Sequence, residues 1–272
     1  MAPIRILSYL PNPRIWKATI TGRLCGVEVE IRGAPVADMP SWLWDFDARF
    51  LDERERAELV HLRRGGKTGF GTGLIKTEAF LRLNPFGAVP VAFDASGSIG
   101  IFESNSIMRA VARLGGEGSG LYGRDPFSAS RIDSFLDAGL VLGRDSQPYL
   151  LNLLGNSIVA ADHARASNAF RTYMEGIERA LHEAPFLAGD DLSLADICLV
   201  AELALLHNER PRISDLKAAG VSPLLGAEAD AAYPATMRHF WSLVRRDAFS
   251  SDCMPYLTKL GIYEPPKSAR TS

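Results

Sequence analysis

Apolar positions recur with two different periods over the first 115 residues of the chain. Residues 4–9 and 27–32 have the short apolar or alternating pattern of β-strands. Between them, Trp16, Ile20 and Leu24 recur near the helical period, and Gly26 is a stop signal for a helix over 14–24. A strand, a helix and a strand of these lengths predict a βαβ unit.

A second group of elements is predicted over residues 77–115. Residues 77–83 have the composition of a short helix, and 91–93 and 99–102 read as strands joined by the turn 94–97. A helix then opens at 103–105, with Ile107, Val111 and Leu114 on one face and Gly115 past its end. The order of elements is therefore β-α-β-α-β-β-α.

The insertion at 34–76 is longer than a compact domain of this order needs. We expect the aromatic run 40–45 to cap a helix and 52–64 to form a helix with a solvated, charged face. Residues 65–73 are glycine-rich, and their GKTG lacks both a full phosphate-loop motif and a preceding strand, so no nucleotide site is predicted. The insertion is expected to serve as a lid or a partner surface. Its Trp42, Trp44 and Phe46 lie either at that surface or against their own domain.

The chain changes character after a Gly-rich linker at 116–126. Residues 127–265 read as an all-helical domain, and the tail 266–272 is polar and expected to be disordered. Helices are predicted at 127–154, 162–181 and 233–244, and Gly139 and Gly143 either kink the first or let a neighbour approach closely. Ser193 and Asp196 have the spacing of a capping box, and the helix they open is apolar around most of its surface, which predicts burial.

Composition excludes several classes of protein. The chain has 272 residues and a net charge of -2, which argues against a nucleic-acid partner. Its three cysteines are widely spaced, so neither a disulfide framework nor a metal site is predicted. No apolar run is long enough to span a membrane, and no signal peptide is visible, so we expect a cytoplasmic protein with no membrane partner.

Two short motifs carry the candidate chemistry. Pro90 lacks an N–H and must stand at the start of its strand, which leaves the backbone groups of Val89 for something extended lying alongside. Glu103 and Ser104 open a helix, and a helix N-terminus that carries a hydroxyl suits a carboxylate.

The stretches LNPFGAVPVAF, FESNSI and FLAGDDLSLADICLV resemble the glutathione S-transferase superfamily. The likeness is to the transferase domain of elongation factor 1 gamma and to fungal transferases. Some heterodimeric bacterial lignin β-aryl etherases are related to those fungal enzymes, so the resemblance also points to an etherase subunit. The elongation-factor role itself is not expected, because those proteins carry a further domain and this chain ends at Ser272.

The resemblance implies an α/β plus all-α protein. A thioredoxin-like domain at 1–115 would bind glutathione as co-substrate, and the helical domain would follow it. Val89, beside a cis Pro90, would pair main chain to main chain with the cysteinyl part of glutathione. Ser104 would hold the γ-glutamyl carboxylate and Glu103 the amine.

The group that activates the thiol is left open by the sequence. The family places a Tyr, Ser or Cys just after the first strand, and the absence of Cys from this region argues against the thiol-exchange classes. By register with Lys17, Asn12 or Arg14 occupies that place, and Ser8 and Tyr9 are further candidates. The alternatives are a turn role for Asn12, a surface ion pair for Arg14 and a core position for Tyr9.

The resemblance implies that glutathione thiolate attacks an electrophilic carbon of a hydrophobic aromatic substrate. The specific expectation is cleavage of a β-aryl ether with release of a phenol. A non-catalytic scaffold subunit and a generic detoxifying transferase are the two alternatives. A homodimer, or a heterodimer with a related subunit, is the expected assembly.

Overall fold

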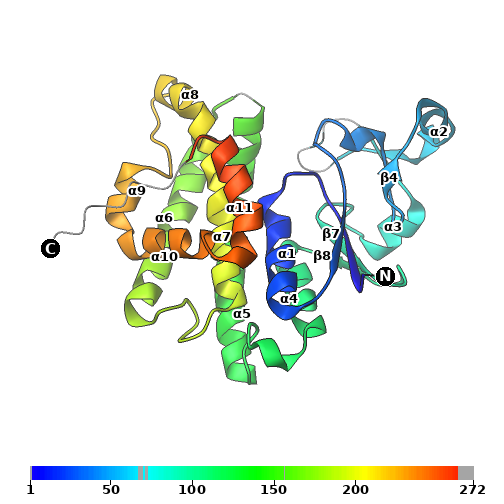
Figure 1. Ribbon diagram of the computed structural model, residues 1–272. Coiled ribbons are helices and arrows are strands. Elements are labelled where there is room, and N and C mark those ends of the chain that lie inside the picture. Colours follow the sequence, from blue (N-terminus) through cyan, green and yellow to red (C-terminus); the bar gives the residue numbers. More distant parts are fainter. Residues whose placement is uncertain (1, 67–69, 71–72, 156, 263–272) are drawn as a thin grey trace. The chain divides into compact units, whose positions relative to one another are not determined.

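The computed structural model describes residues 2–66, 70, 73–155 and 157–262. The chain divides into two compact units, Met1–Ser119 and Gly120–Ser272. Figure 1 shows sheets and helices in the first unit and helices in the second. The predicted disordered tail and the core of the GKTG motif lie outside the described residues.

A four-stranded sheet forms the centre of the first unit. Its strand order is β2-β1-β7-β8, with β1 and β2 parallel and the other neighbours antiparallel. The sequence-predicted elements appear in order: β1 (Ile4–Leu7), α1 (Pro13–Cys25), β2 (Val29–Arg32), α3 (Glu78–Leu83), β7 (Val91–Asp94), β8 (Gly100–Phe102) and α4 (Ser104–Leu114). The predicted thioredoxin-like order is therefore confirmed.

Local signals explain where the helices begin and end. Asn12 caps α1, and Gly26 ends it in the left-handed conformation at φ 68°, which only glycine adopts without strain. Thr77 caps α3 through its hydroxyl, which accepts from the Phe80 N–H. Helices α1 and α4 pack against each other beside the sheet (Figure 1).

Both faces of the sheet carry buried apolar side chains. Because Leu7 pairs with Val91 and Arg5 with Phe93, these residues share one face. Leu7, Val91 and Phe93 are buried there in one cluster with Phe80 of α3. Strand alternation turns the neighbouring residues of β1 and β7 to the other face of the sheet.

The insertion forms a second small sheet of order β4-β3-β6-β5. Its elements are η1 (Met39–Ser41), β3 (Trp42–Trp44), β4 (Arg49–Phe50), α2 (Glu53–Glu58), η2 (Val60–Leu62), β5 (Arg63–Arg64) and β6 (Leu74–Lys76). The prediction that the aromatic run caps a helix is wrong, because this run is a strand paired with β4 and β6. The charged helix has no buried residue, as expected, but it ends at Glu58, and the rest of the predicted segment forms η2 and β5.

The insertion's aromatic residues pack on their own unit. Trp44 is 1% exposed and joins the buried cluster of Leu7 and Phe93, with its indole N–H donating to the Met39 carbonyl at 3.2 Å. Trp42 and Phe46 are partly buried against the same cluster. Of the two alternatives for these side chains, the structure therefore favours packing within the domain.

The second unit consists of helices in the described residues. They are α5 (Pro126–Leu154), α6 (Ala160–Glu183), α7 (Leu194–Leu206), η4 (His207–Arg212), α8 (Ile213–Ala218), α9 (Ala227–Ala232), α10 (Pro234–Val244) and α11 (Asp247–Lys259). All residues of α7 are buried, as its all-round apolar sequence predicts. A Cβ at Gly139 of α5 would lie 2.9 Å from Cys198 Sγ of α7, so this glycine permits close helix approach.

The predicted capping box is present at the start of α7. The Asp196 carboxylate accepts from the Ser193 N–H and the Ser193 hydroxyl, both at 2.9 Å. The same carboxylate accepts from the Leu187 N–H at 3.1 Å and faces His239 Nε2 at 2.8 Å. One buried side chain thus joins the loop before α7 to helix α10.

Candidate functional site

The ends of three strands lie together at one end of the central sheet. Leu7 pairs with Val91, and Val91 pairs with Phe102. The residues after β1, before β7 and after β8 therefore lie at this same end of the sheet. The sequence-predicted site residues all lie in the segments next to these strand ends: Ser8, Asn12 and Arg14 after β1, Val89 and Pro90 before β7, and Glu103 and Ser104 after β8.

The loop before β7 presents an unpaired stretch of backbone. The Val89–Pro90 peptide bond is cis. The Lys76 ammonium donates to the Gly87 carbonyl at 2.6 Å and holds this loop from inside. Val89 is half-buried and forms no backbone hydrogen bond with another described residue. Its N–H and C=O are able to pair with an extended ligand.

The start of α4 is shaped by a strained residue. Glu103 has φ 68° and ψ 125°, and it is the one non-glycine residue with positive φ in the described part of the chain. Such a conformation costs about 1–3 kcal/mol and is found at functional sites. Its exposed side chain makes no capping hydrogen bond, so the first amides of α4 have no side-chain acceptor there. These amides suit an anion.

A buried lysine lies beside this helix start. Lys17 of α1 is 1% exposed, and its ammonium donates to Asn105 Oδ1 at 2.7 Å and to Ser104 Oγ at 3.3 Å. An ammonium has only donors, so Ser104 Oγ acts as the acceptor in this contact. The Ser104 proton is then directed to another acceptor, and the positive charge reinforces the dipole of α4.

The start of α1 is organised by Asn12, which is 1% exposed. Its Nδ2 donates to Ser8 Oγ at 3.0 Å, and its Oδ1 accepts from the Arg14 N–H at 3.0 Å. The Ile15 N–H donates to the Asn12 carbonyl. Pro13 has no N–H, so Asn12 uses the first two amides of α1. A thiolate here would have to be stabilised by side chains.

The other three candidates of this segment differ in accessibility. Ser8 is fully buried, and its hydroxyl is held by Asn12. Tyr9 is partly buried against the central cluster, with its ring 6.3 Å from that of Phe70. Arg14 is half-buried in the first turn of α1.

The sequence interpretation missed Lys17 and Asn105 as members of the site. Lys17 served there only to set the register of α1, and Asn105 only as part of the helix opening. One signal was available, because Lys17 lies four residues after Pro13 and three before Ile20, on a face that proves buried. Its partner lies 88 residues away, and no local pattern connects the two.

No protein-family model matches the chain. Individual relatives do match it. The probable elongation factor 1-gamma 2 of Arabidopsis thaliana is 28% identical over 176 residues, which are 64% of this chain and 38% of that protein. The chain thus spans well under half of that relative. Glutathione S-transferase 2 of Anopheles gambiae is 30% identical over 152 residues, covering 54% of this chain and 70% of that one.

Solved structures agree with the fold. A glutathione S-transferase from Methylobacillus flagellatus with glutathione bound has a TM-score of 0.61 and 13% identity, over 92% of this chain and 98% of that one. The fold is therefore that of the glutathione transferases, with a thioredoxin-like unit followed by a helical one. The match to the transferase of Anopheles gambiae, at 30% identity over 70% of that protein, shows that the chain belongs to the glutathione S-transferase family.

No helix within the described ranges is long and apolar enough to cross a membrane.

Proposed function

We propose that the chain binds glutathione at the site formed by Val89 and the start of α4, and that the glutathione thiolate attacks an electrophilic carbon, forming a thioether and releasing the leaving group of that carbon. One observation carries the proposal: the unpaired backbone of Val89 and the uncapped helix start at Ser104 come together where β7 begins and β8 ends. Glutathione is an extended tripeptide with a carboxylate at its γ-glutamyl end. It would pair with Val89 through its cysteinyl main chain.

The γ-glutamyl carboxylate would be recognised by Ser104, together with Lys17 and the first amides of α4. The Ser104 hydroxyl accepts from Lys17 and donates to the carboxylate, while the first amides of α4 surround the anion. Lys17 is a positioning residue in this arrangement, because it acts through Ser104. The exposed Glu103 would receive the γ-glutamyl amine as an ion pair.

The binding step is tested by a single hydroxyl. Ser104→Ala should weaken glutathione binding by about 1–3 kcal/mol, because the buried carboxylate loses a charge-assisted hydrogen bond. Isothermal titration calorimetry measures the change. Ser106→Ala, two residues further along the same helix, is the matched control and should bind like the wild type. Equal affinity in all three proteins would argue against this site.

The thiolate is stabilised by a side chain, and Arg14 is the stronger candidate. Asn12 is almost wholly buried and already caps α1, whereas Arg14 is half-buried in the same turn with a permanent positive charge. We therefore assign Asn12 the role of holding Ser8 and the helix start.

The pH–rate profile separates these roles. Arg14→Ala should raise the apparent pKa of the bound thiol by about one unit or more, since a nearby cation favours the thiolate. Turnover then falls at neutral pH and recovers at alkaline pH. Asn12→Ser keeps a capping oxygen for the Arg14 N–H and should leave the profile unchanged. A shifted profile in Asn12→Ser with an unshifted one in Arg14→Ala would transfer the role to Asn12.

A narrower proposal concerns the electrophile. The likeness to lignin β-aryl etherases supports attack by thiolate on a saturated carbon that carries an aryloxy group, with a phenolate of pKa near ~10 as leaving group. Such attack inverts the carbon, and a chiral binding site orients the two enantiomers differently, so one enantiomer of a racemic β-aryl ether should be consumed first. Chiral chromatography of the reaction with glutathione, alone and with related subunits, follows both ether and phenol. Absence of phenol, together with turnover of an aryl halide, would leave a generic transferase.

A non-catalytic role is the second candidate. It is favoured by the burial of both Ser8 and Asn12, and by matches to elongation factor 1-gamma proteins. Glutathione binding without conjugation of 1-chloro-2,4-dinitrobenzene or any aryl ether would support it. Measurable turnover that Ser104→Ala reduces would reject it.

A further inference from the structure

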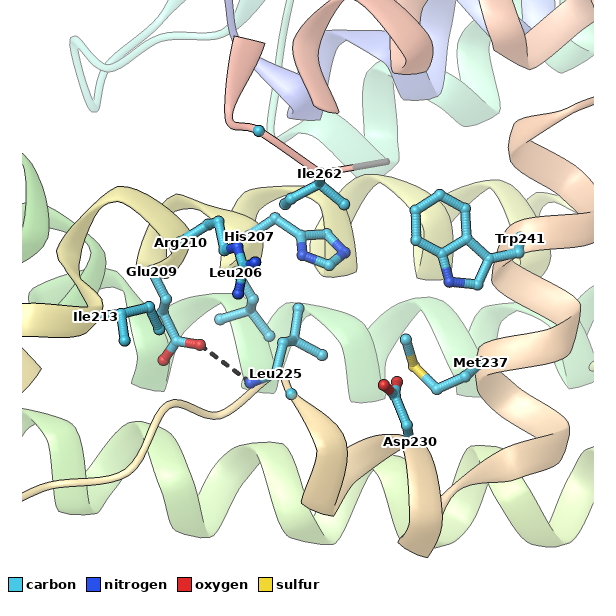
Figure 2. A pocket seen from close by; sticks show the side chains of 12 residues that line it. Leu206, His207, Glu209, Arg210, Ile213, Leu225, Asp230, Met237, Trp241 and Ile262 are labelled. Carbon is cyan, nitrogen blue, oxygen red and sulfur yellow. Dashed lines mark hydrogen bonds between the residues drawn. The ribbon is translucent and has the colours of Figure 1, made fainter. Parts of the chain in front are cut away.

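The helical unit contains a cavity of about 290 Å³ whose residues have no part in the glutathione proposal. It is open to solvent, lies at the end of α7 and is lined by residues of η4, α8, α9 and α10 and of the segments before α9 and after α11 (Figure 2). Six of its twelve lining residues have apolar side chains: Leu206, Ile213, Leu225, Met237, Trp241 and Ile262. Ile262 is half-buried and forms part of the rim.

His207 is one of the polar residues that line this cavity. Figure 2 shows its imidazole ring in the middle of the lining residues, with Ile262 and Trp241 beside it. The ring centroid lies 6.3 Å from that of Trp241. Its Nε2 atom is buried and has no hydrogen-bond partner in the described part of the chain. An unmet buried nitrogen of this kind is costly, and a ligand that bonds to it would remove the cost.

The charges around the cavity do not select an ion. Arg210 and Asp230 both line it, are both exposed to water and have opposite signs. Glu209 is engaged elsewhere, since its carboxylate accepts from the Tyr149 hydroxyl and the Leu225 N–H at 2.6 and 3.0 Å. Burial, and secondarily the charge of Arg210, lowers the pKa of His207 to about 4, so its ring is neutral at pH 7.

We propose that this cavity binds a small neutral phenol, with the ring between Trp241 and the aliphatic wall and the hydroxyl on His207 Nε2. A neutral imidazole presents Nε2 either as an acceptor or as a donor, according to its tautomer. A phenol hydroxyl both donates and accepts, so it satisfies either form. The flat ring matches the indole face and the apolar wall.

The test is calorimetry of the full chain at pH 7.5 with phenol and with toluene, which has a methyl group in place of the hydroxyl. His207→Phe keeps an aromatic ring and removes the nitrogen. We expect it to raise the Kd of phenol about three- to tenfold, as one hydrogen bond predicts, and to leave that of toluene unchanged or lower. His207→Gln restores a polar nitrogen and should retain more phenol affinity than His207→Phe.

Two further variants locate the site. Ile262→Trp fills the rim and should weaken both probes, whereas His182→Phe, at an exposed histidine of α6, should change neither. The proposal is overturned if phenol does not bind to the wild type, if His207→Phe weakens phenol and toluene equally, or if Ile262→Trp changes neither Kd. Circular dichroism of each variant confirms its fold before titration.

Discussion

Replacing Asp196 by alanine should lower the free energy of unfolding of the chain by about 3–5 kcal/mol. Its carboxylate is 0% exposed and accepts from the Ser193 N–H, the Ser193 hydroxyl and the Leu187 N–H. His239 Nε2 stands 2.8 Å from the same group. Removing the carboxylate leaves three buried donors without acceptors and also removes the capping box of α7.

Urea unfolding followed by circular dichroism measures this loss. Asp191→Ala is the matched control, because Asp191 lies on the same loop but is exposed, and its loss should change stability by less than about 0.5 kcal/mol. Asp196→Asn keeps the shape and some acceptors and should fall between the two. A cost below about 1 kcal/mol in Asp196→Ala would show that the loop–helix junction contributes little.

Replacing Lys17 by methionine should weaken glutathione binding about 10- to 100-fold while leaving the fold intact. The loss corresponds to about 1.5–3 kcal/mol, the range for a hydrogen bond that involves a charged group. Lys17 holds Ser104 Oγ and Asn105 Oδ1 and adds positive charge where the carboxylate would bind. Methionine fills a similar volume but removes the ammonium donor to Asn105 Oδ1, so a loss of stability of about 1–3 kcal/mol is expected beside the loss of binding.

Thr21→Val is the control for this substitution. Thr21 is also buried on α1, but its hydroxyl donates to the Lys17 carbonyl and not to α4. It should bind glutathione like the wild type. Calorimetry and thermal unfolding of both variants separate binding from stability. Lys17→Met with normal glutathione affinity would show that Ser104 needs no support from α1.

Much of the fold followed from local sequence signals. Asn12 and Gly26 mark the two ends of α1, and the turn between β7 and β8 marks the hairpin. The all-round apolar sequence of α7 predicted its burial. These signals were sufficient because each depends on residues that are close together in the chain.

The strands of the insertion and the place of Lys17 in the site could not be predicted in the same way. Strands β3 to β6 have only two or three residues each, too few to show an alternating pattern. Their partners are distant, as in the pairing of Leu43 with Ile75. The aromatic residues of β3 therefore resemble a helix start in the sequence, because their place in a sheet depends on these distant partners. Lys17 resembled an ordinary helix-surface residue for the same reason.

The geometry of glutathione in a crystal structure of the complex tests the central claim most directly. The account predicts that the Ser104 hydroxyl donates to the γ-glutamyl carboxylate at about 2.5–3.0 Å. It also predicts that the Val89 N–H and C=O pair with the cysteinyl residue. Glutathione bound with its carboxylate away from Ser104, or with the backbone of Val89 still unpaired, would contradict the account.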